Sequence, residues 1–228
     1  MLSVSIVSCS QANAMVPYGE KLCNQPGFSC INVKSGQTWH RLFPDAGARD
    51  LLQRINRTNL RLRAGMQLAV PQALDRLTVY DIAPLPHYIE SNGEKIIYVN
   101  QEKLAWAAYD EAGEMVWWGP ISAGSPHCSA VGGQCKTPTG VYRIIRKQGF
   151  ECISTAFPRR SNGQHGGAKM PFCMHFFQGY ALHGSTEVPG YPDSHGCVRM
   201  FVKDAQWLNE AFVDIPGGGM QGTRVIIE

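Results

Sequence analysis

Residue types suited to covalent chemistry lie close together near the end of the sequence. The stretch Ser194-His195-Gly196-Cys197-Val198-Arg199-Met200 contains a thiol, an imidazole and a guanidinium, and His183 lies fourteen residues before Cys197. A cysteine attacks as its thiolate, and an ordinary thiol, with a pKa near 8.5, is largely protonated at pH 7. A nearby imidazolium would lower the pKa of the thiol, and the histidine could then serve as acid and base for the amines that leave and attack. These residue types could therefore support nucleophilic chemistry at Cys197.

Neighbouring residues fit the same chemistry. Gly196 lets the backbone bend closely, so the N–H groups of Gly196 and Cys197 are expected to face a developing oxyanion. Arg199 can hold a substrate carboxylate through its planar fork. Spacing alone, however, favours a plainer alternative, in which Cys197 is buried or disulfide-bonded and the histidines are structural.

The composition indicates a mainly β protein with many turns. The chain has 228 residues, is 44% hydrophobic and only 17% charged, and contains 24 Gly and 14 Pro. A chain of this length and apolar content can bury a core, which excludes general disorder. The net charge of +3, without a basic run, argues against a nucleic-acid partner. No apolar stretch reaches the roughly 18 residues that a transmembrane segment needs.

Residues 1–14 are expected to be a leader or its remnant. They are mildly apolar and end in Ala12-Asn13-Ala14, the small-x-small pattern of a secretory cleavage site. They lack a basic stretch and their apolar part is short, so the alternative is that they are not a signal. Ile6-Val7-Ser8-Cys9 also resembles a lipoprotein box, which would make Cys9 a lipid anchor. We expect an exported protein of the periplasm or cell envelope.

Six cysteines remain once Cys9 and Cys197 are set aside, an even number that suits disulfides in an exported chain. The expected pairs are Cys23–Cys30, Cys128–Cys135 and Cys152–Cys173, although six cysteines allow other pairings. A zinc site is the alternative, but the chain has no CxxC or HExxH motif. A metal site made of His175, His183 and His195 would lack a carboxylate or second cysteine in register. We expect neither a metal nor another cofactor.

The first third of the chain is expected to hold a small folded unit. Residues 15–28 form a cysteine-bounded segment. Residues 29–72 begin and end with strand-like runs and have apolar residues at helical spacing between them, which predicts a strand–helix–helix–strand unit. Residues 73–93 are interpreted as a linker or a lead-in strand.

From residue 94 the pattern turns to β. Strands are expected at 95–100, 103–109, 114–121, 140–145 and 223–227, and an amphipathic helix at 202–212. Trp117 and Trp118 are more typical of a core or groove wall than of a ligand platform. Four other histidines have no assigned task and are expected at the surface or in a groove: His40, His87, His127 and His175.

Residues 29–72 resemble a LysM domain, which is a peptidoglycan-binding module. The matching words are Val33-Lys34-Ser35-Gly36-Gln37-Thr38, Leu52 with Asn56, and Gly65-Met66-Gln67-Leu68-Ala69-Val70-Pro71. Gln37 stands where an acidic residue is usual, and Phe43-Pro44 interrupts the first helix. The alternative is a small αβ cap that packs on the rest of the chain without binding glycan.

Residues 94–228 resemble the L,D-transpeptidase family of YkuD type. Five words match in order: Ile121-Ser122-Ala123-Gly124, Lys136-Thr137-Pro138-Thr139-Gly140-Val141-Tyr142-Arg143-Ile144, Met170-Pro171-Phe172, Gly179-Tyr180-Ala181-Leu182-His183-Gly184, and Ser194 to Met200. The resemblance implies a β-sandwich-like catalytic domain with a short helix, preceded by the small α+β LysM-like module. Only ten residues separate His183 from Ser194, fewer than is usual for the family, which puts acceptor specificity in doubt.

The resemblance also implies the reaction and its residues. Cys197 would attack the bond between a diamino acid and the terminal D-alanine of a peptidoglycan stem tetrapeptide, release D-alanine, and pass the acyl group to a second stem as a 3–3 cross-link. His183 would be the acid/base partner, with His195 as the alternative base and Ser194 as a less suitable nucleophile. The substrate pocket would be shaped by Ser194, His195, Gly196, Arg199, Tyr180 and Gly184, with the Gly184 carbonyl orienting His183. A carbapenem would acylate the same thiol.

Other activities fit the same residues. Water instead of an amine would make the chain an L,D-carboxypeptidase, and a protein lysine would make it an enzyme that attaches proteins to the wall. A third alternative is a non-catalytic wall-binding or host-interaction protein. The expected partners are peptidoglycan stem peptides and glycan.

Overall fold

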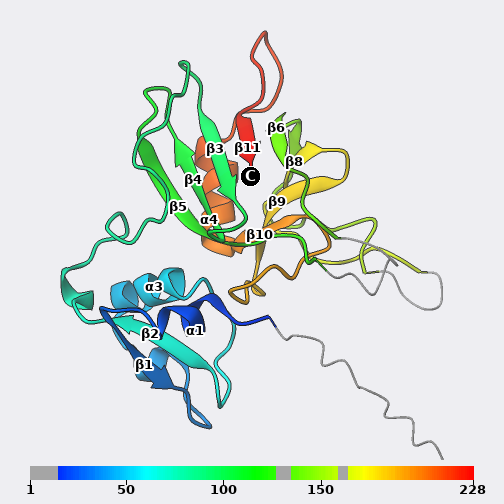
Figure 1. The fold of residues 1–228 in the computed structure, drawn as a ribbon. Coiled ribbons are helices and arrows are strands. Elements are labelled where there is room, and N and C mark those ends of the chain that lie inside the picture. The colour runs from blue at the N-terminus through cyan, green and yellow to red at the C-terminus, as the bar shows by residue number, and fades with distance from the viewer. Residues whose placement is uncertain (1–14, 127–134, 159–163) are drawn as a thin grey trace, which may run out of the picture.

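The structure, a computed structural model, describes residues 15–126, 135–158 and 164–228 (Figure 1). The expected leader and the lipid-anchor candidate Cys9 lie outside these residues. We call residues 15–72 the N-terminal module and residues 94–228 the sheet domain. The N-terminal module contains α1 (Tyr18–Leu22), β1 (Phe28–Asn32), α2 (Trp39–Leu42), α3 (Ala46–Ile55) and β2 (Gln67–Pro71), and η1 (Leu74–Arg76) follows it.

After α1, the N-terminal module has the strand–helix–helix–strand order predicted for residues 29–72. β1 and β2 pair antiparallel, and the core between them and α3 is apolar, with Val33, Leu52 and Leu68 all buried. The Asp45 side chain accepts a hydrogen bond from Ala48 N (2.7 Å) and so begins α3. The Asn56 side chain, at the end of α3, exchanges hydrogen bonds of 2.8 Å with both backbone groups of Ala69 and thereby ties α3 to β2.

The described residues of the sheet domain form a nine-stranded sheet. Its strands are β3 (Ile96–Asn100), β4 (Ala105–Tyr109), β5 (Met115–Ser122), β6 (Gly140–Arg143), β7 (Arg146–Lys147), β8 (Met174–Phe177), β9 (Tyr180–Ser185), β10 (Val198–Phe201) and β11 (Arg224–Ile227). The order is β6-β11-β3-β4-β5-β10-β9-β8-β7, and only the pairs β3–β11 and β9–β10 are parallel. The mainly β fold class predicted from the sequence is therefore confirmed.

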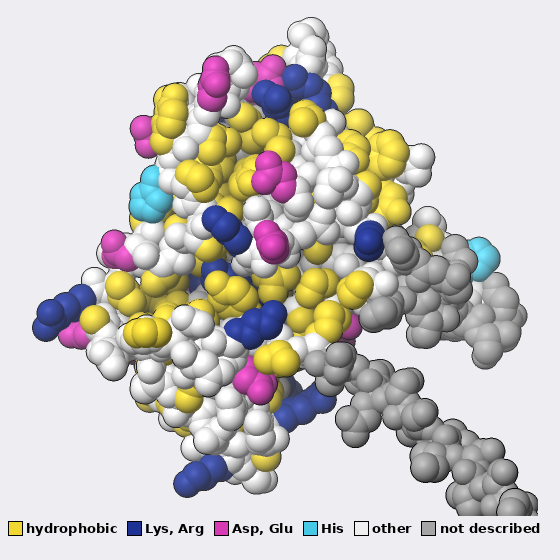
Figure 2. Space-filling view, in the orientation of Figure 1, with side chains coloured by type: hydrophobic (Ala, Val, Ile, Leu, Met, Phe, Trp, Pro, Cys, Tyr) yellow, Lys and Arg dark blue, Asp and Glu magenta, His cyan; other side chains and the backbone are white. Residues whose placement is uncertain are grey.

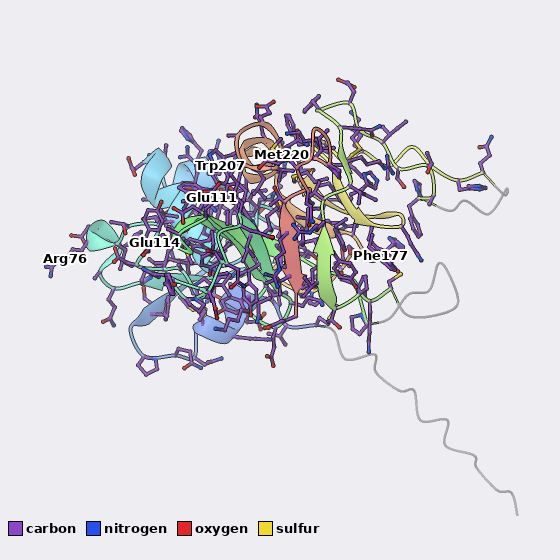
Figure 3. All side chains as sticks on the ribbon, turned by 90° about the horizontal axis from the view of Figure 1, so that it is seen from above. Arg76, Glu111, Glu114, Phe177, Trp207 and Met220 are labelled. Atoms are coloured by element: carbon purple, nitrogen blue, oxygen red, sulfur yellow. A yellow bond between two sulfur atoms is a disulfide. The ribbon has the colours of Figure 1, made fainter. Side chains whose placement is uncertain are left out.

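The sheet curls until its two ends approach each other. The ring of Tyr142 in β6 lies 5.3 Å from Phe176 and 5.2 Å from Phe177 in β8, and Ile145 N donates to His175 O (2.8 Å). In Figure 3, Phe177 lies at this junction, on the opposite side of the molecule from Arg76 in η1. Because the sheet closes on itself, most of its inner side chains are buried in one core.

A helix covers this core. The predicted helix at 202–212 is present as α4 (Val202–Trp207), which continues into a π-helical turn, η2 (Leu208–Phe212). Ala205, Leu208 and Phe212 are buried against the sheet. The predicted strands of the sheet domain are present within about two residues of their expected bounds.

Residues 73–93, interpreted from the sequence as a linker or lead-in strand, join the two parts of the chain and are packed against the sheet domain. They form no strand beyond one isolated bridge, between Tyr88 and Glu114. Trp118 Nε1 donates to Val79 O (2.5 Å), and the Tyr109 hydroxyl donates to Pro86 O (2.7 Å). Buried tryptophan and tyrosine need partners for their polar ends, and this segment supplies them.

The N-terminal module is docked on the sheet domain through α3, which lies between the small sheet and the sheet domain in Figure 1. Arg54 is fully buried and forms a bidentate ion pair with Asp204 of α4 (2.7 and 3.0 Å) while donating to Trp118 O (2.7 Å). Hydrophobic side chains gather at this junction on the face shown in Figure 2. In the described part of the chain, no helix is both long and apolar enough to span a bilayer.

Candidate active site

Strands β9 and β10 bring the candidate catalytic residues to one face of the sheet. They run parallel, with Val198 opposite Leu182 and Arg199 opposite His183. Continuing this register by one residue places Cys197 opposite Ala181. Because alternate residues of a strand share a face, Cys197, Arg199 and His183 project together, while Leu182 and Val198 point into the core. His183 and Cys197 are fourteen positions apart in sequence, but the fold places them diagonally across neighbouring strands, a spacing that side chains can bridge.

His183 is buried and held in one tautomer. It is 6% exposed, and its Nδ1 lies 2.9 Å from Gly184 O. A carbonyl oxygen only accepts, so Nδ1 carries the hydrogen and Nε2 keeps its lone pair. Burial lowers the pKa of His183 to about 4, with the Arg199 charge acting in the same direction. His183 is therefore a neutral base at pH 7.

Cys197 is the free cysteine of the described residues. Its side chain is partly exposed and packs against the cluster of Met170, Ala181, Cys152 and Cys173. Burial raises the pKa of the thiol, although the Ala181 N–H and the Arg199 charge oppose this effect. These pKa directions favour a resting pair in which both groups are neutral over the thiolate and imidazolium expected from the sequence.

The backbone around Gly196 is fixed by hydroxyl groups. Ser194 Oγ donates to Cys197 O (2.5 Å) and accepts from Gly196 N (3.0 Å), while Thr137 Oγ1 donates to Gly196 O (2.8 Å). The Gly196 N–H, which was expected to face a developing oxyanion, donates to Ser194 Oγ in this structure. Tyr180 covers Gly196 so closely that an added Cβ would lie 2.5 Å from its ring.

Arg199 and His195 lie at the rim of the site. Arg199 Nη1 lies 3.3 Å from Asp193 Oδ2 and donates to Glu187 O (3.4 Å), so an acidic side chain already competes for the expected substrate carboxylate. His195 is exposed and stacks on Phe157, with ring centroids 4.7 Å apart. Partial burial and Arg199 lower the pKa of His195. This placement favours His183 over His195 as the base.

Two residues near the site were not identified from the sequence. Thr137, 3% exposed, bridges Gly124 N and Gly196 O. It lies in the segment from Lys136 to Ile144 that resembles the family, but its residue type alone indicates no role. His175 was expected at the surface or in a groove, yet it is buried in β8 opposite Ala181, and its Nδ1 has no hydrogen-bond partner. Alternation along β8 puts His175 on the same face as Cys197. His40 and His87 are exposed, and His127 lies outside the described residues.

One of the disulfides lies beside the site. The structure joins Cys23 to Cys30 and Cys152 to Cys173. Cys135 is also disulfide-bonded, and its expected partner Cys128 lies outside the described residues. The Cys152–Cys173 bond ties the loop before β8 to the segment at 149–153, directly beside Cys197.

Comparisons with known proteins find similarity to L,D-transpeptidases. A family model of the YkuD L,D-transpeptidase catalytic domain matches residues 94–227. Among solved structures, an L,D-transpeptidase from Xylanimonas cellulosilytica DSM 15894 is 24% identical, with a TM-score of 0.53, covering 78% of this chain and 78% of that chain. L,D-transpeptidases from Mycobacterium smegmatis (16% identity, TM-score 0.46) and Stackebrandtia nassauensis (19%, 0.43) align over 59% and 62% of this chain, and 58% of each of theirs.

The comparisons carry different weight. Curated protein sequences gave no match. The likeness to the Xylanimonas structure concerns the fold. The family match spans more than half of the chain and includes both His183 and Cys197. This chain belongs to the YkuD family of L,D-transpeptidase catalytic domains.

Proposed function

We propose that the sheet domain forms 3–3 cross-links in peptidoglycan with Cys197 as its nucleophile. The observation that carries this proposal is the shared face of β9 and β10, where a free thiol projects beside a neutral histidine whose tautomer is fixed by Gly184. A neutral imidazole with a free Nε2 lone pair is the form that can take a proton from a thiol.

The acylation half-reaction begins with a neutral pair. As the Cys197 sulfur attacks the carbonyl between the diamino acid and D-alanine, its proton moves to His183 Nε2. The resulting imidazolium is stabilised by the Gly184 carbonyl at Nδ1 and gives its proton to the departing D-alanine amine. A thioester between Cys197 and the shortened stem remains. This proton transfer replaces the preformed thiolate, which burial disfavours.

The second half-reaction restores the enzyme. The side-chain amine of a second stem loses a proton to His183 Nε2 and attacks the thioester. The C–S bond breaks, the cross-link forms, and the proton on His183 returns to Cys197. Ser194 and Thr137 support this cycle because their hydroxyl groups hold both carbonyls of the Gly196-Cys197 backbone.

The remaining assignments support the same polymer. We propose that residues 29–72 are a LysM-like module that binds peptidoglycan glycan, that catalysis lies within residues 94–228, and that the protein is exported. The strand–helix–helix–strand order supports the first of these. Two disulfides support an oxidising compartment, since cytosolic thiols are kept reduced. Tyr180 and Arg199, which border Cys197, are the proposed contacts for the stem.

Intact mass spectrometry after exposure to a carbapenem tests the nucleophile. We expect one covalent adduct on the full chain, none on Cys197→Ala, and slow formation on His183→Gln. An adduct retained by Cys197→Ala would refute the proposal. Purified tetrapeptide stems then separate the activities: a cross-linked dimer indicates transfer to an amine, whereas tripeptide alone indicates hydrolysis.

A further inference from the structure

The loop between the two proposed catalytic residues is held from two sides. We call residues 185–193 the connecting loop, because it runs from the end of β9, two residues after His183, to Ser194. Its second half is fastened by the sheet domain: Ser122 Oγ donates to Tyr191 O (2.8 Å) and accepts from Asp193 N (3.0 Å). Its first half contacts the N-terminal module.

The main contact of the first half is the side chain of Asn59. Asn59 Nδ2 donates to Ser185 O (2.8 Å), and Asn59 Oδ1 accepts from Val188 N (3.0 Å). The backbone of Asn59 adds a third hydrogen bond, from its N to Val188 O (3.2 Å). One amide thus spans the first turn of the connecting loop, using its donor and its acceptor at once.

The chain is held in an unusual conformation where it delivers Asn59. Arg57, at the end of α3, has φ 54°, a left-handed conformation in which glycine is the usual residue. Its buried guanidinium donates to Lys103 O (3.3 Å) and lies 5.0 Å from the Trp118 ring and 4.8 Å from the Tyr18 ring. Non-glycine residues keep this conformation only where their surroundings fix it, and such sites concentrate near function. The contacts of Arg57 therefore fix the direction of the chain, so that Thr58 and Asn59 face the connecting loop.

A further backbone contact closes the interface. Tyr18 N donates to Gly190 O (2.9 Å), and Thr58 forms an isolated bridge with Pro189. Gly190 has φ 88°, and a Cβ there would lie 3.2 Å from Asn56 O. The N-terminal module therefore contacts the loop at 185, 188, 189 and 190, all between His183 and Cys197.

We propose that Asn59 is a positioning residue for acyl transfer, which fixes the connecting loop and through it the placement of His183 relative to Cys197. The inference rests on the proposed function, because it assigns Asn59 a role in that reaction. The N-terminal module is on this account part of the catalytic unit, in addition to any glycan that it binds.

The test compares variants of the full chain. Asn59→Asp keeps an acceptor for Val188 N but cannot donate to Ser185 O, and Asn59→Ala removes both bonds. Asp50→Asn is the matched control, since Asp50 pairs with Lys203 and Arg54 at the same interface without touching the connecting loop. The measurements are the carbapenem acylation rate, the iodoacetamide alkylation rate of Cys197 from pH 5 to 10, and the melting temperature.

We expect acylation to slow about tenfold or more in both Asn59 variants, because small displacements of reacting groups have effects of this size. The pH dependence of alkylation should shift as well, whereas Asp50→Asn should lower only the melting temperature. Acylation and alkylation within twofold of wild type in both Asn59 variants would overturn the inference. Absence of acylation in the wild type would instead refute the proposed function, and the alkylation profiles would still decide the role of Asn59.

Discussion

At the residue scale, burial sets the protonation of the proposed catalytic pair. His183 and Cys197 each lose hydration that would stabilise their charged forms, so the pKa of the imidazole falls to about 4 and that of the thiol rises. Sequence alone cannot give these directions, because adjacency of a thiol and an imidazole fits an ion pair equally well. Solvent exclusion, which depends on the whole fold, selects the neutral pair.

A pH profile of Cys197 alkylation checks this state. Iodoacetamide reacts with thiolate, so we expect the rate for the native protein to keep rising with pH up to and beyond pH 9. The Cys197→Ala variant supplies the background. A plateau already reached below pH 7 would show a preformed thiolate and contradict the neutral pair.

His175 gives a second prediction at this scale. Its folded-state pKa is about 4, lowered by burial and by Arg146, against about 6.5 in the unfolded chain. Between pH 4 and pH 6.5 the unfolded state binds more protons than the folded state. The contribution of His175 to the free energy of unfolding is therefore complete above pH 6.5 and is lost as the pH falls toward 4. The free energy of unfolding, measured by urea titration, should therefore fall between pH 7 and pH 5 by about 2 kcal/mol less in His175→Phe than in the wild type. His40→Phe, at an exposed histidine, is the control and should follow the wild type; an unchanged slope in His175→Phe would contradict the argument.

At the scale of elements, the strands that hold the site were harder to predict than those that form the scaffold. β3, β4, β5 and β11 are rich in apolar and aromatic residues between turn signals, and their bounds agree closely with expectation. β9 and β10 were covered only by motifs that resemble the family, and β8 was not predicted at all. The face that they turn away from Leu182 and Val198 carries His175, His183 and Cys197, residues that interrupt the alternating pattern. The parallel β9–β10 pairing depends on contacts distant in sequence.

Gly196 links these elements in a testable way. Its φ is 119°, and a Cβ there would meet the Tyr180 ring at 2.5 Å, so alanine would be strained by both backbone and contact. We expect Gly196→Ala to lower the free energy of unfolding by about 1–3 kcal/mol and to slow acylation. Gly179→Ala is the matched control, because an added Cβ there has no neighbour within 4 Å. Equal urea midpoints and acylation rates for the two variants would contradict this role.

At the scale of the whole molecule, the docking of the N-terminal module on the sheet domain could not be predicted from the sequence. Arg54 and Asp204 are 150 residues apart, and neither lies in a recognised motif. Asn59, Thr137 and Arg54 are common residue types whose importance comes only from what the fold places beside them. The reaction type could be predicted from a short motif, whereas the parts that hold the motif in place could not.

The buried ion pair predicts cooperative unfolding. Asp204→Asn would leave Arg54 buried with only part of its charge compensated, which should lower the free energy of unfolding by about 3 kcal/mol. Asp214→Asn breaks the more exposed pair with Lys95 and should cost less than about 1 kcal/mol. Urea titrations followed by tryptophan fluorescence compare the two. A separate early transition of the N-terminal module in the wild type would contradict its tight docking.

The docking of the N-terminal module also limits which other modules could be fused to the sheet domain. A chimera that joined residues 94–228 to a foreign binding module would uncover the Trp118 ring and carbonyl, leave Asp204 without Arg54, and release the carbonyls of Ser185 and Val188. Any replacement must supply a cation for Asp204 and a paired amide for the connecting loop. Substitutions at Arg54 or Asn59 therefore require matching changes in the sheet domain, and the sequences of the two parts are constrained to change together.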